Sequence, residues 1–329
     1  MRQLNLDVEV TRGDAVESRH RVHAAVVEGE ELVAAARDPH LVTPWRSCAK
    51  PFQVMPLLTA GGFDHLGWGD EELALACASH GAEPEHLAVA QRMLASIGLE
   101  EGDLACGPHE PLSGRGVRLW RESGKPLGRL HNNCSGKHAA MLARAVTMGW
   151  PTHGYQRIEH QVQRSCIGEV SCWSGVPLDD MGVAVDGCSV AVMILPIDRA
   201  ALAYARLGAA IHAGDEVPNR VAAAVRAHAH LLGGTERFDT VVLQETGGRV
   251  ITKVGAEGVH SVTVPDRRLG FTVKVEDGAL RAQHAAVVDA LRQLEVLPEL
   301  PPRLAEYLHK PVRNTRGEVV GELRMAERQ

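Results

Sequence analysis

The chain has 329 residues, of which 45% are hydrophobic and 23% charged, and a formal net charge of -6. This composition is typical of a globular protein with a large core, and the acidic balance disfavours nucleic acid or an anionic membrane as a partner. The sequence has no apolar run near the ~20 residues of a membrane span and no signal-peptide core. Its seven cysteines are odd in number and sparse, which favours reduced thiols. We therefore expect a cytoplasmic protein that acts on a small molecule.

Short strands are expected first, then helices, then short strands again. The N-terminal strands are 8–10, 19–27 and 31–35. The middle of the chain predicts helices at 57–66 (with a break at 61–62), 70–77, 85–97, 139–148, 158–171, 199–212 and 217–232, a long loop over 106–128 and a strand over 181–194 that is interrupted at 186–188. The last part predicts strands at 240–243, 249–254, 258–264 and 270–275, and helices at 281–294 and 301–309. This order indicates a single α/β (α+β) domain over 1–329, with an antiparallel sheet formed by both termini, helices on its faces and a helical middle region.

The first candidate for chemistry is the segment 46–53, which reads R-S-C-A-K-P-F-Q. If a helix begins there, Ser47 and Lys50 project from one face at i and i+3. A lysine removes a serine proton only where burial or a second cation leaves the amine partly neutral. The pair predicts a serine nucleophile in a dry cleft, and the alternative is an ordinary helix start with a solvated lysine.

Two further short segments admit a structural and a chemical interpretation. Ser79 lies in A-S-H-G, which is either a helix end with Gly81 as a left-handed cap or a second hydroxyl that passes protons or binds a substrate carboxylate. Lys253 lies in I-T-K-V-G and is either an exposed lysine beside a turn or a positive charge. Such a charge would lower the pKa of Lys50 or pair with Ser79 as a second base.

A fourth group contains two cysteines and a lysine. Cys134 and Lys137 are three residues apart, and Cys188 follows some fifty residues later. Thiolates suit a soft cation such as zinc, but C-x-x-K is not a standard zinc spacing, so two core cysteines are the alternative. The preceding Asn132 and Asn133 resemble a cap that directs backbone N–H groups outward and lowers the pKa of a thiol.

Five motifs occur in order along the chain: R-S-C-A-K-P-F-Q, A-S-H-G-A-E-P-E-H, H-N-N-C-S-G-K-H-A-A-M-L, V-D-G-C and T-K-V-G-A-E-G. Together they resemble the rhizobial-type, or class 3, L-asparaginases of the asparaginase II domain family, from about residue 8 to about residue 325. The resemblance implies a fold like that of the serine β-lactamases and penicillin-binding proteins. It also implies L-asparagine as the substrate and a homodimer.

The resemblance further implies roles for single residues. Ser47 matches the nucleophile and Lys50 its base, while Ser79 and Lys253 match a second serine–lysine pair. The residues that match the ligands of a zinc ion near the active site are Cys134, Lys137 and Cys188. Asp186 matches a residue close to that site, and the expected substrate-binding residues are Arg46, His80 and Asp186.

These roles predict hydrolysis of the asparagine side-chain amide to L-aspartate and ammonia through a serine acyl-enzyme. Glutamine stays open as a substrate because one methylene changes binding by only about 1 to 3 kcal/mol. Two alternatives use part of the same residues: a β-lactamase-like, penicillin-recognising hydrolase and a non-enzymatic zinc-binding protein. The sequence lacks an S-D-N element and reads T-K-V-G where a penicillin-recognising enzyme has K-T-G, which disfavours penicillin binding.

Overall fold

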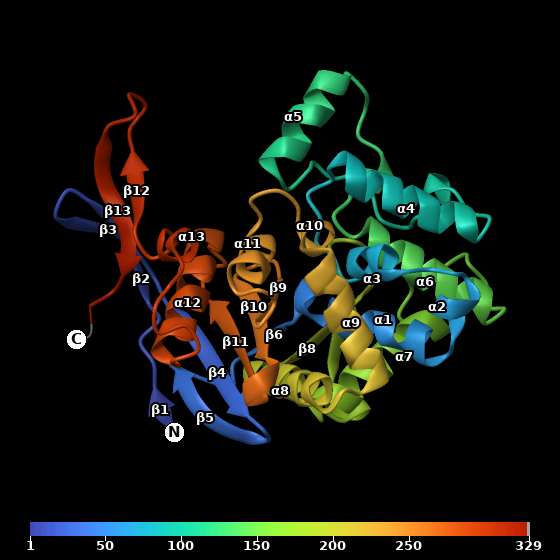
Figure 1. Cartoon of the computed structure of the whole chain (residues 1–329), viewed down its shortest axis with the longest axis horizontal. Coiled ribbons are helices and arrows are strands. Elements are labelled where there is room, and N and C mark those ends of the chain that lie inside the picture. The colour runs from blue at the N-terminus through green and yellow to red at the C-terminus, as the bar shows by residue number, and fades with distance from the viewer. Residues whose placement is uncertain (328–329) are drawn as a thin grey trace. The chain divides into compact units, whose positions relative to one another are not determined.

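The computed structural model describes residues 1–327, and the chain divides into two compact units (Figure 1). The sheet unit comprises Met1–Cys48, Pro196–Ala209 and Glu245–Gln329. The helical unit comprises Ala49–Leu195 and Ala210–Gln244. None of the described helices is both long and apolar enough to cross a bilayer.

The sheet unit contains a six-stranded sheet that joins the two ends of the sequence. Its strands, in spatial order, are β1 (Arg2–Gln3), β5 (Glu31–Ala36), β4 (Val22–Glu28), β11 (Leu269–Val275), β10 (Val259–Val264) and β9 (Ile251–Val254). At its centre β4 pairs antiparallel with β11, and Ala25 lies opposite Thr272. Only the short β1 pairs in parallel, with β5, among the described strands of this sheet. The predicted antiparallel sheet formed by both termini is therefore confirmed.

A second sheet in the same unit also combines early and late residues. Its strands are β12 (Lys310–Arg313), β13 (Val319–Met325), β2 (Val8–Arg12) and β3 (Ala15–His20), drawn in red and blue in Figure 1. Leu323 of β13 pairs with Val10 of β2. The single strand predicted over 19–27 is wrong, because the chain passes at Arg21 from β3 in this sheet to β4 in the other.

Helix α8 (Ile197–Ala213) packs against the six-stranded sheet through small residues. Ala25 and Val27 of β4 share one apolar cluster with Ala201 and Ala205 of α8. A Cβ atom at Gly270 of β11 would lie 2.1 Å from the backbone nitrogen of Ala205, so only glycine allows this approach. The remaining helices of the unit are α12 (Leu280–Gln293), which packs on β10 and β11, and α13 (Pro302–Ala305).

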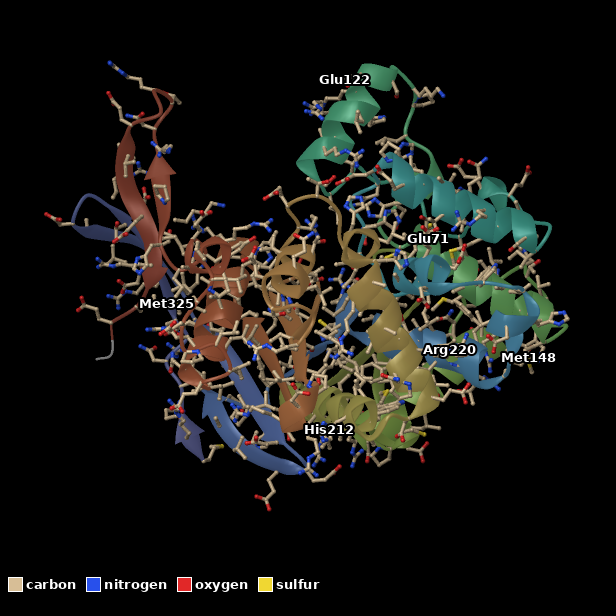
Figure 2. The ribbon with its side chains drawn as sticks, in the orientation of Figure 1. Glu71, Glu122, Met148, His212, Arg220 and Met325 are labelled. Atoms are coloured by element: carbon tan, nitrogen blue, oxygen red, sulfur yellow. The ribbon has the colours of Figure 1, made fainter. Side chains whose placement is uncertain are left out.

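The helical unit surrounds one buried helix. Helix α1 (Lys50–Thr59) is buried from Lys50 to Leu58, which is unusual for a helix that opens with a lysine. It packs against α6 and α7. The other helices are α2 (Gly62–His65), α3 (Asp70–Ala76), α4 (Pro84–Ser96), α5 (Gly114–Ser123), α6 (Ser135–Thr147), α7 (Gln161–Ser174), α9 (Glu216–Ala227), α10 (Ala229–Leu232) and α11 (Phe238–Glu245). Arg220 on α9, labelled in Figure 2, pairs with Asp64 on α2 at 2.7 Å.

Several element predictions for this unit are wrong. The strand predicted over 240–243 is part of helix α11, and the loop predicted over 106–128 contains helix α5. Helix α5 is capped by Ser113, whose Oγ accepts a hydrogen bond of 2.9 Å from Gly116 N. The strand predicted over 181–194 is an antiparallel hairpin of β7 (Gly182–Val185) and β8 (Ala191–Pro196), and the interruption predicted at 186–188 lies in its turn.

Candidate active site

The predicted nucleophile lies in a constrained segment of the sheet unit. Strand β6 (Val42–Pro44) leads to the short 3-10 helix η1 (Arg46–Ala49), where Ser47 is half-buried. Arg46 has a φ of 51°, in the left-handed region that non-glycine residues adopt only where the surroundings hold them. The preceding Trp45 is fixed, because its indole donates to Ser261 Oγ at 3.0 Å. The backbone that leads into Ser47 is thus fixed by its surroundings.

Cys48 connects this segment by a hydrogen bond to strand β9, which carries Lys253. The thiol of Cys48 donates to the carbonyl of Lys253 at 3.1 Å, and Tyr204 Oη donates to the Cys48 carbonyl at 2.8 Å. A Cβ atom at Gly255 would lie 3.0 Å from Cys48 Sγ, closer than ordinary packing. The glycine of the T-K-V-G motif therefore lets η1 lie against β9.

Lys253 itself is buried. Only 1% of the residue is exposed, and its Nζ donates to the carbonyl of Val254 at 2.9 Å. The interpretation of Lys253 as an exposed lysine beside a turn is wrong. A buried amine without water must be hydrogen-bonded or neutral, so this position is an unusual place for an ordinary lysine.

Lys50 opens helix α1 in the helical unit and is also 1% exposed. Its Nζ donates to the carbonyl of Ala78 and lies 3.4 Å from the carbonyl of Asn133 and 3.0 Å from Ser79 Oγ. The two carbonyls can only accept, so they take two N–H groups of the amine. The third position on the nitrogen faces Ser79 Oγ. This position is an N–H group in the ammonium form and a lone pair in the neutral amine. Lys50 and Ser79 are therefore placed to exchange a proton.

Ser79 lies in a buried loop after helix α3, which ends at Ala76. The loop is anchored by a hydrogen bond of 3.1 Å from Ser79 N to the carbonyl of Leu232. Gly81 is not a left-handed cap, because the left-handed residue is Ala82, with a φ of 53°. The capping interpretation of this segment is therefore wrong.

His80 is completely buried, with 0% exposure. Its Nδ1 accepts from Ala82 N at 3.2 Å, and its Nε2 lies 2.9 Å from Ser135 Oγ. Burial, together with the charges of His86 and Lys50, holds the pKa of His80 well below its ordinary value. The ring is therefore neutral and bonded at both nitrogens, and substrate binding by His80 stays a prediction.

The predicted metal ligands converge within the helical unit. Lys137 on α6 donates to Cys188 Sγ at 3.0 Å, and all three side chains are buried. A hydrogen bond from Cys134 lowers the pKa of Cys188 to about 5 although burial opposes it, and the same bond, with burial, raises the pKa of Cys134 to about 12. Burial alone would lower the pKa of Lys137, but the nearby sulfurs raise it. These groups form a buried thiolate–ammonium pair next to a second thiol.

The donor set of this group fits a soft cation. Two sulfurs and one amine lie together, and Asp186 Oδ2 is 3.6 Å from Cys188 Sγ. Zinc prefers such sulfur and nitrogen donors, and its binding would require the amine and both thiols to lose their protons. Asn132 Oδ1 accepts from Cys134 N at 2.9 Å and so fixes the start of this ligand segment. The residues are suitable for zinc, which stays an expectation.

Comparison with known proteins then gives the family. The sequence matches the family L-asparaginase II over residues 8–325, nearly its whole length. The chain belongs to the L-asparaginase II family. No curated protein matches it.

Among solved structures, this L-asparaginase II family member is similar to one titled "Crystal Structure Analysis of Mglu in its native form", with 14% identity and a TM-score of 0.48. The match covers 85% of this chain, which spans 64% of the length of that structure. The β-lactamase-like fold and the single-domain organisation expected from the sequence stay predictions.

One charged cluster of this L-asparaginase II family member was missed from the sequence. Glu83, Glu85 and His230 have side-chain oxygens and nitrogens within 4.8 Å of one another. Arg115 Nη1 lies 2.6 Å from Glu83 and 2.8 Å from Glu85, and its hydrogen bonds lower the pKa of Glu85 to about 2. The arginine already supplies the positive charge, so the cluster is an ion-pair network. The E-P-E-H letters of the second motif were its only signal.

Proposed function

We propose that this L-asparaginase II family member hydrolyses the side-chain amide of L-asparagine to L-aspartate and ammonia through an acyl-enzyme on Ser47. The observation that carries the proposal is the family match along residues 8–325. The burial of Lys50 supports it, because a lysine in bulk water stays protonated and is unable to act as a base.

In the first half of the proposed reaction, Ser47 Oγ attacks the amide carbon of the substrate and its proton passes to neutral Lys50. The new C–O bond gives a tetrahedral oxyanion, which backbone N–H groups stabilise. The C–N bond then breaks, and the proton held by lysine goes to the nitrogen, so that ammonia leaves. The product of this half is an aspartyl ester on Ser47.

In the second half, water attacks the ester carbon and gives its proton to lysine. The ester C–O bond breaks, L-aspartate leaves, and the proton returns to Ser47. Ser79 supports both halves as a relay, because its hydroxyl lies 3.0 Å from Lys50 Nζ. The pairing of Ser79 with Lys253 expected from the resemblance stays a prediction.

We assign substrate binding to charged residues and to the zinc site. Arg46 and Asp186 supply opposite charges for the α-carboxylate and α-amine of asparagine. Cys134, Lys137 and Cys188 would hold zinc, which when bound supplies a positive, electron-accepting position for a substrate carboxylate or amine. The proposal also includes a homodimer and a cytoplasmic location. The mass of the purified protein in solution tests whether it is a dimer.

Ammonia release from L-asparagine and from L-glutamine, with and without a chelator, tests the proposed function. Ser47→Ala should lower turnover of L-asparagine by roughly 10,000-fold or more, since a nucleophile is lost. Ser18→Ala is the matched control, a half-buried serine of the same unit, and should keep full activity. Near-normal ammonia release by Ser47→Ala would remove the nucleophile assignment. Turnover of a chromogenic penicillin in its place would favour the β-lactamase-like alternative.

The proposed metal site has a separate readout in the metal content of the purified protein. Cys134→Ser and Cys188→Ser should each reduce bound zinc, because a hydroxyl is a poor ligand for this cation. Cys172→Ser, which changes an exposed cysteine, should leave the zinc content unchanged. Equal zinc in all three variants would rule out this site. Zinc binding without labelling by a serine-acylating reagent would favour a non-enzymatic zinc protein.

A further inference from the structure

The loop that carries Ser79 contains a strained residue that needs an explanation. Ala82 is buried and has a φ of 53°, a conformation in which the Cβ of an L residue meets its own backbone. Such residues persist only where neighbouring groups determine the backbone, and they are common at functional sites. The group that binds the amide of Ala82 is the side chain of His80.

The imidazole of His80 links two segments of the chain. Its Nδ1 accepts from Ala82 N at 3.2 Å, so the ring proton of the neutral histidine is on Nε2. That nitrogen donates to Ser135 Oγ, 2.9 Å away, at the start of α6. The backbone adds a second link, because His80 N donates to the carbonyl of Asn133 at 3.3 Å. His80 thus ties the loop 78–82 to residues 133–135.

The two segments that His80 joins are also the two that surround the amine of Lys50. The Nζ atom contacts Ser79 Oγ at 3.0 Å and the carbonyl of Asn133 at 3.4 Å. A shift of either segment therefore changes the direction of the amine toward the hydroxyl. We propose that His80 is a positioning residue: its imidazole fixes the backbone at Ala82 and the start of α6, and so holds Ser79 against Lys50. This inference rests on the proposed function for its kinetic effect.

His86 provides an internal control for this proposal. Its ring stacks on that of His80, with centroids 5.1 Å apart, and is equally buried. Its Nδ1 accepts from Glu83 N at 3.0 Å, and its Nε2 lies 3.0 Å from the carbonyl of His230. The two histidines therefore have the same burial and the same kind of hydrogen bonds, but those of His86 fix the start of α4 and a carbonyl of α10, and neither is made to a residue that contacts Lys50 Nζ.

The test compares amide variants at both positions in the full chain. Asparagine places an oxygen near the position of Nδ1, while glutamine places an N–H near Nε2. His80→Gln loses the acceptor for the amide of Ala82. It should lower kcat for L-asparagine by about 10- to 100-fold with little change in KM, because a shift of a catalytic group by about 1 Å lowers the rate by up to about 100-fold. His80→Asn should retain more activity than His80→Gln. His86→Gln should lose thermal stability to a similar degree but keep kcat within about 2-fold.

A double variant separates positioning from general destabilisation. Glycine adopts positive φ without strain, so Ala82→Gly combined with His80→Gln should recover part of the lost kcat. A kcat for His80→Gln equal to that of the wild type would overturn the proposal. Equal losses of kcat in His80→Gln and His86→Gln, in proportion to their loss of stability, would overturn it as well.

Hydrogen exchange gives a readout that does not depend on activity. The amide of Ala82 should exchange slowly in the wild type and much faster in His80→Gln, with little change in His86→Gln. If the wild type fails to release ammonia from L-asparagine, the proposed function fails, and this measurement still decides whether His80 holds the loop. Unchanged exchange at Ala82 in His80→Gln would show that it does not.

Discussion

An amine held by two carbonyls behaves differently from an amine in water. Lys50 Nζ has the carbonyls of Ala78 and Asn133 as fixed acceptors, and these hold it in place in either protonation state. The neutral form keeps a lone pair free for a hydroxyl proton, which is what a general base requires. At this position an arginine is not an equivalent of lysine, because a guanidinium keeps its proton in proteins.

We therefore expect Lys50→Arg to lower kcat for L-asparagine by about 100- to 10,000-fold, the usual contribution of a general base. Lys125→Arg changes an exposed lysine and should have no effect on ammonia release. Thermal unfolding of both variants shows whether the larger side chain disturbs α1. Wild-type kcat in a folded Lys50→Arg protein would contradict the assignment of Lys50 as the base.

The residues of the candidate site were predictable to different extents. The spacing of Ser47 and Lys50 is a local pattern, and the sequence contains it in full. The partners of Lys50 lie 28, 29 and 83 residues away, so no local pattern predicts them. The strain at Ala82 was equally hidden, because alanine is not a residue that usually indicates a left-handed turn.

At the level of elements, the contact between η1 and β9 depends on a missing side chain. A Cβ at Gly255 would lie 2.9 Å from the carbonyl of Val259 and 3.0 Å from Cys48 Sγ, and neither is the free end of a flexible side chain. An added methyl would therefore push η1 away from the strand. Since Cys48 follows Ser47 directly, the displacement would also move the proposed nucleophile.

Gly255→Ala should consequently reduce the free energy of unfolding by about 1 to 3 kcal/mol, the usual cost of overpacking. It should also lower kcat more than an equally destabilising change elsewhere. Urea unfolding and ammonia release measure the two effects. Gly107→Ala is the control, since a Cβ there meets no atom within 4 Å, and it should stay within about 0.5 kcal/mol of the wild type. Wild-type stability and kcat for Gly255→Ala would contradict the expected displacement of η1.

Elements were predictable where periodicity and environment agree. The amphipathic helix α4 (Pro84–Ser96) matches its prediction closely because one face is apolar and the other polar. Helix α11 was predicted as a strand because its residues 240–243 are mostly β-branched, which favours strands locally. Packing overrides that preference here, since Thr240 Oγ1 donates to the carbonyl of Ala229 at 3.1 Å.

For the molecule as a whole, the stacked histidines predict sensitivity to acid. Burial lowers the pKa of His86 from 6.5 to about 4, and that of His80 also falls. As the pH decreases from about 6.5 to about 4, the unfolded chain binds a proton at His86 that the folded chain does not. The free energy of unfolding should therefore fall in this interval, by at most about 1.4 kcal/mol per pH unit for one such group.

Urea unfolding at several pH values measures this slope. His86→Gln should flatten it between pH 6.5 and pH 4, the interval given by the ordinary and lowered pKa. His309→Gln, which changes an exposed histidine, should keep the wild-type slope. Equal slopes in both variants would show that His86 does not contribute to acid unfolding.

The joining of early and late strands was the part of the architecture that the sequence predicted best, because strand-like patterns are concentrated at its two ends. The division into two sheets was not predictable, since residues 19–27 contain no glycine, proline, asparagine or aspartate that would indicate a turn between β3 and β4. The family match covers residues 8–325 and therefore includes residues of both units.

The thiol of Cys48 bonds to the carbonyl of a residue 205 positions later in the chain. A ribosome that has made the first two hundred residues has therefore produced the proposed nucleophile, Ser47, but not the strand against which its segment lies. The serine reaches its final setting only after β9 has been synthesised and has paired. A nascent chain of this protein is accordingly expected to be inert toward asparagine until late in its synthesis.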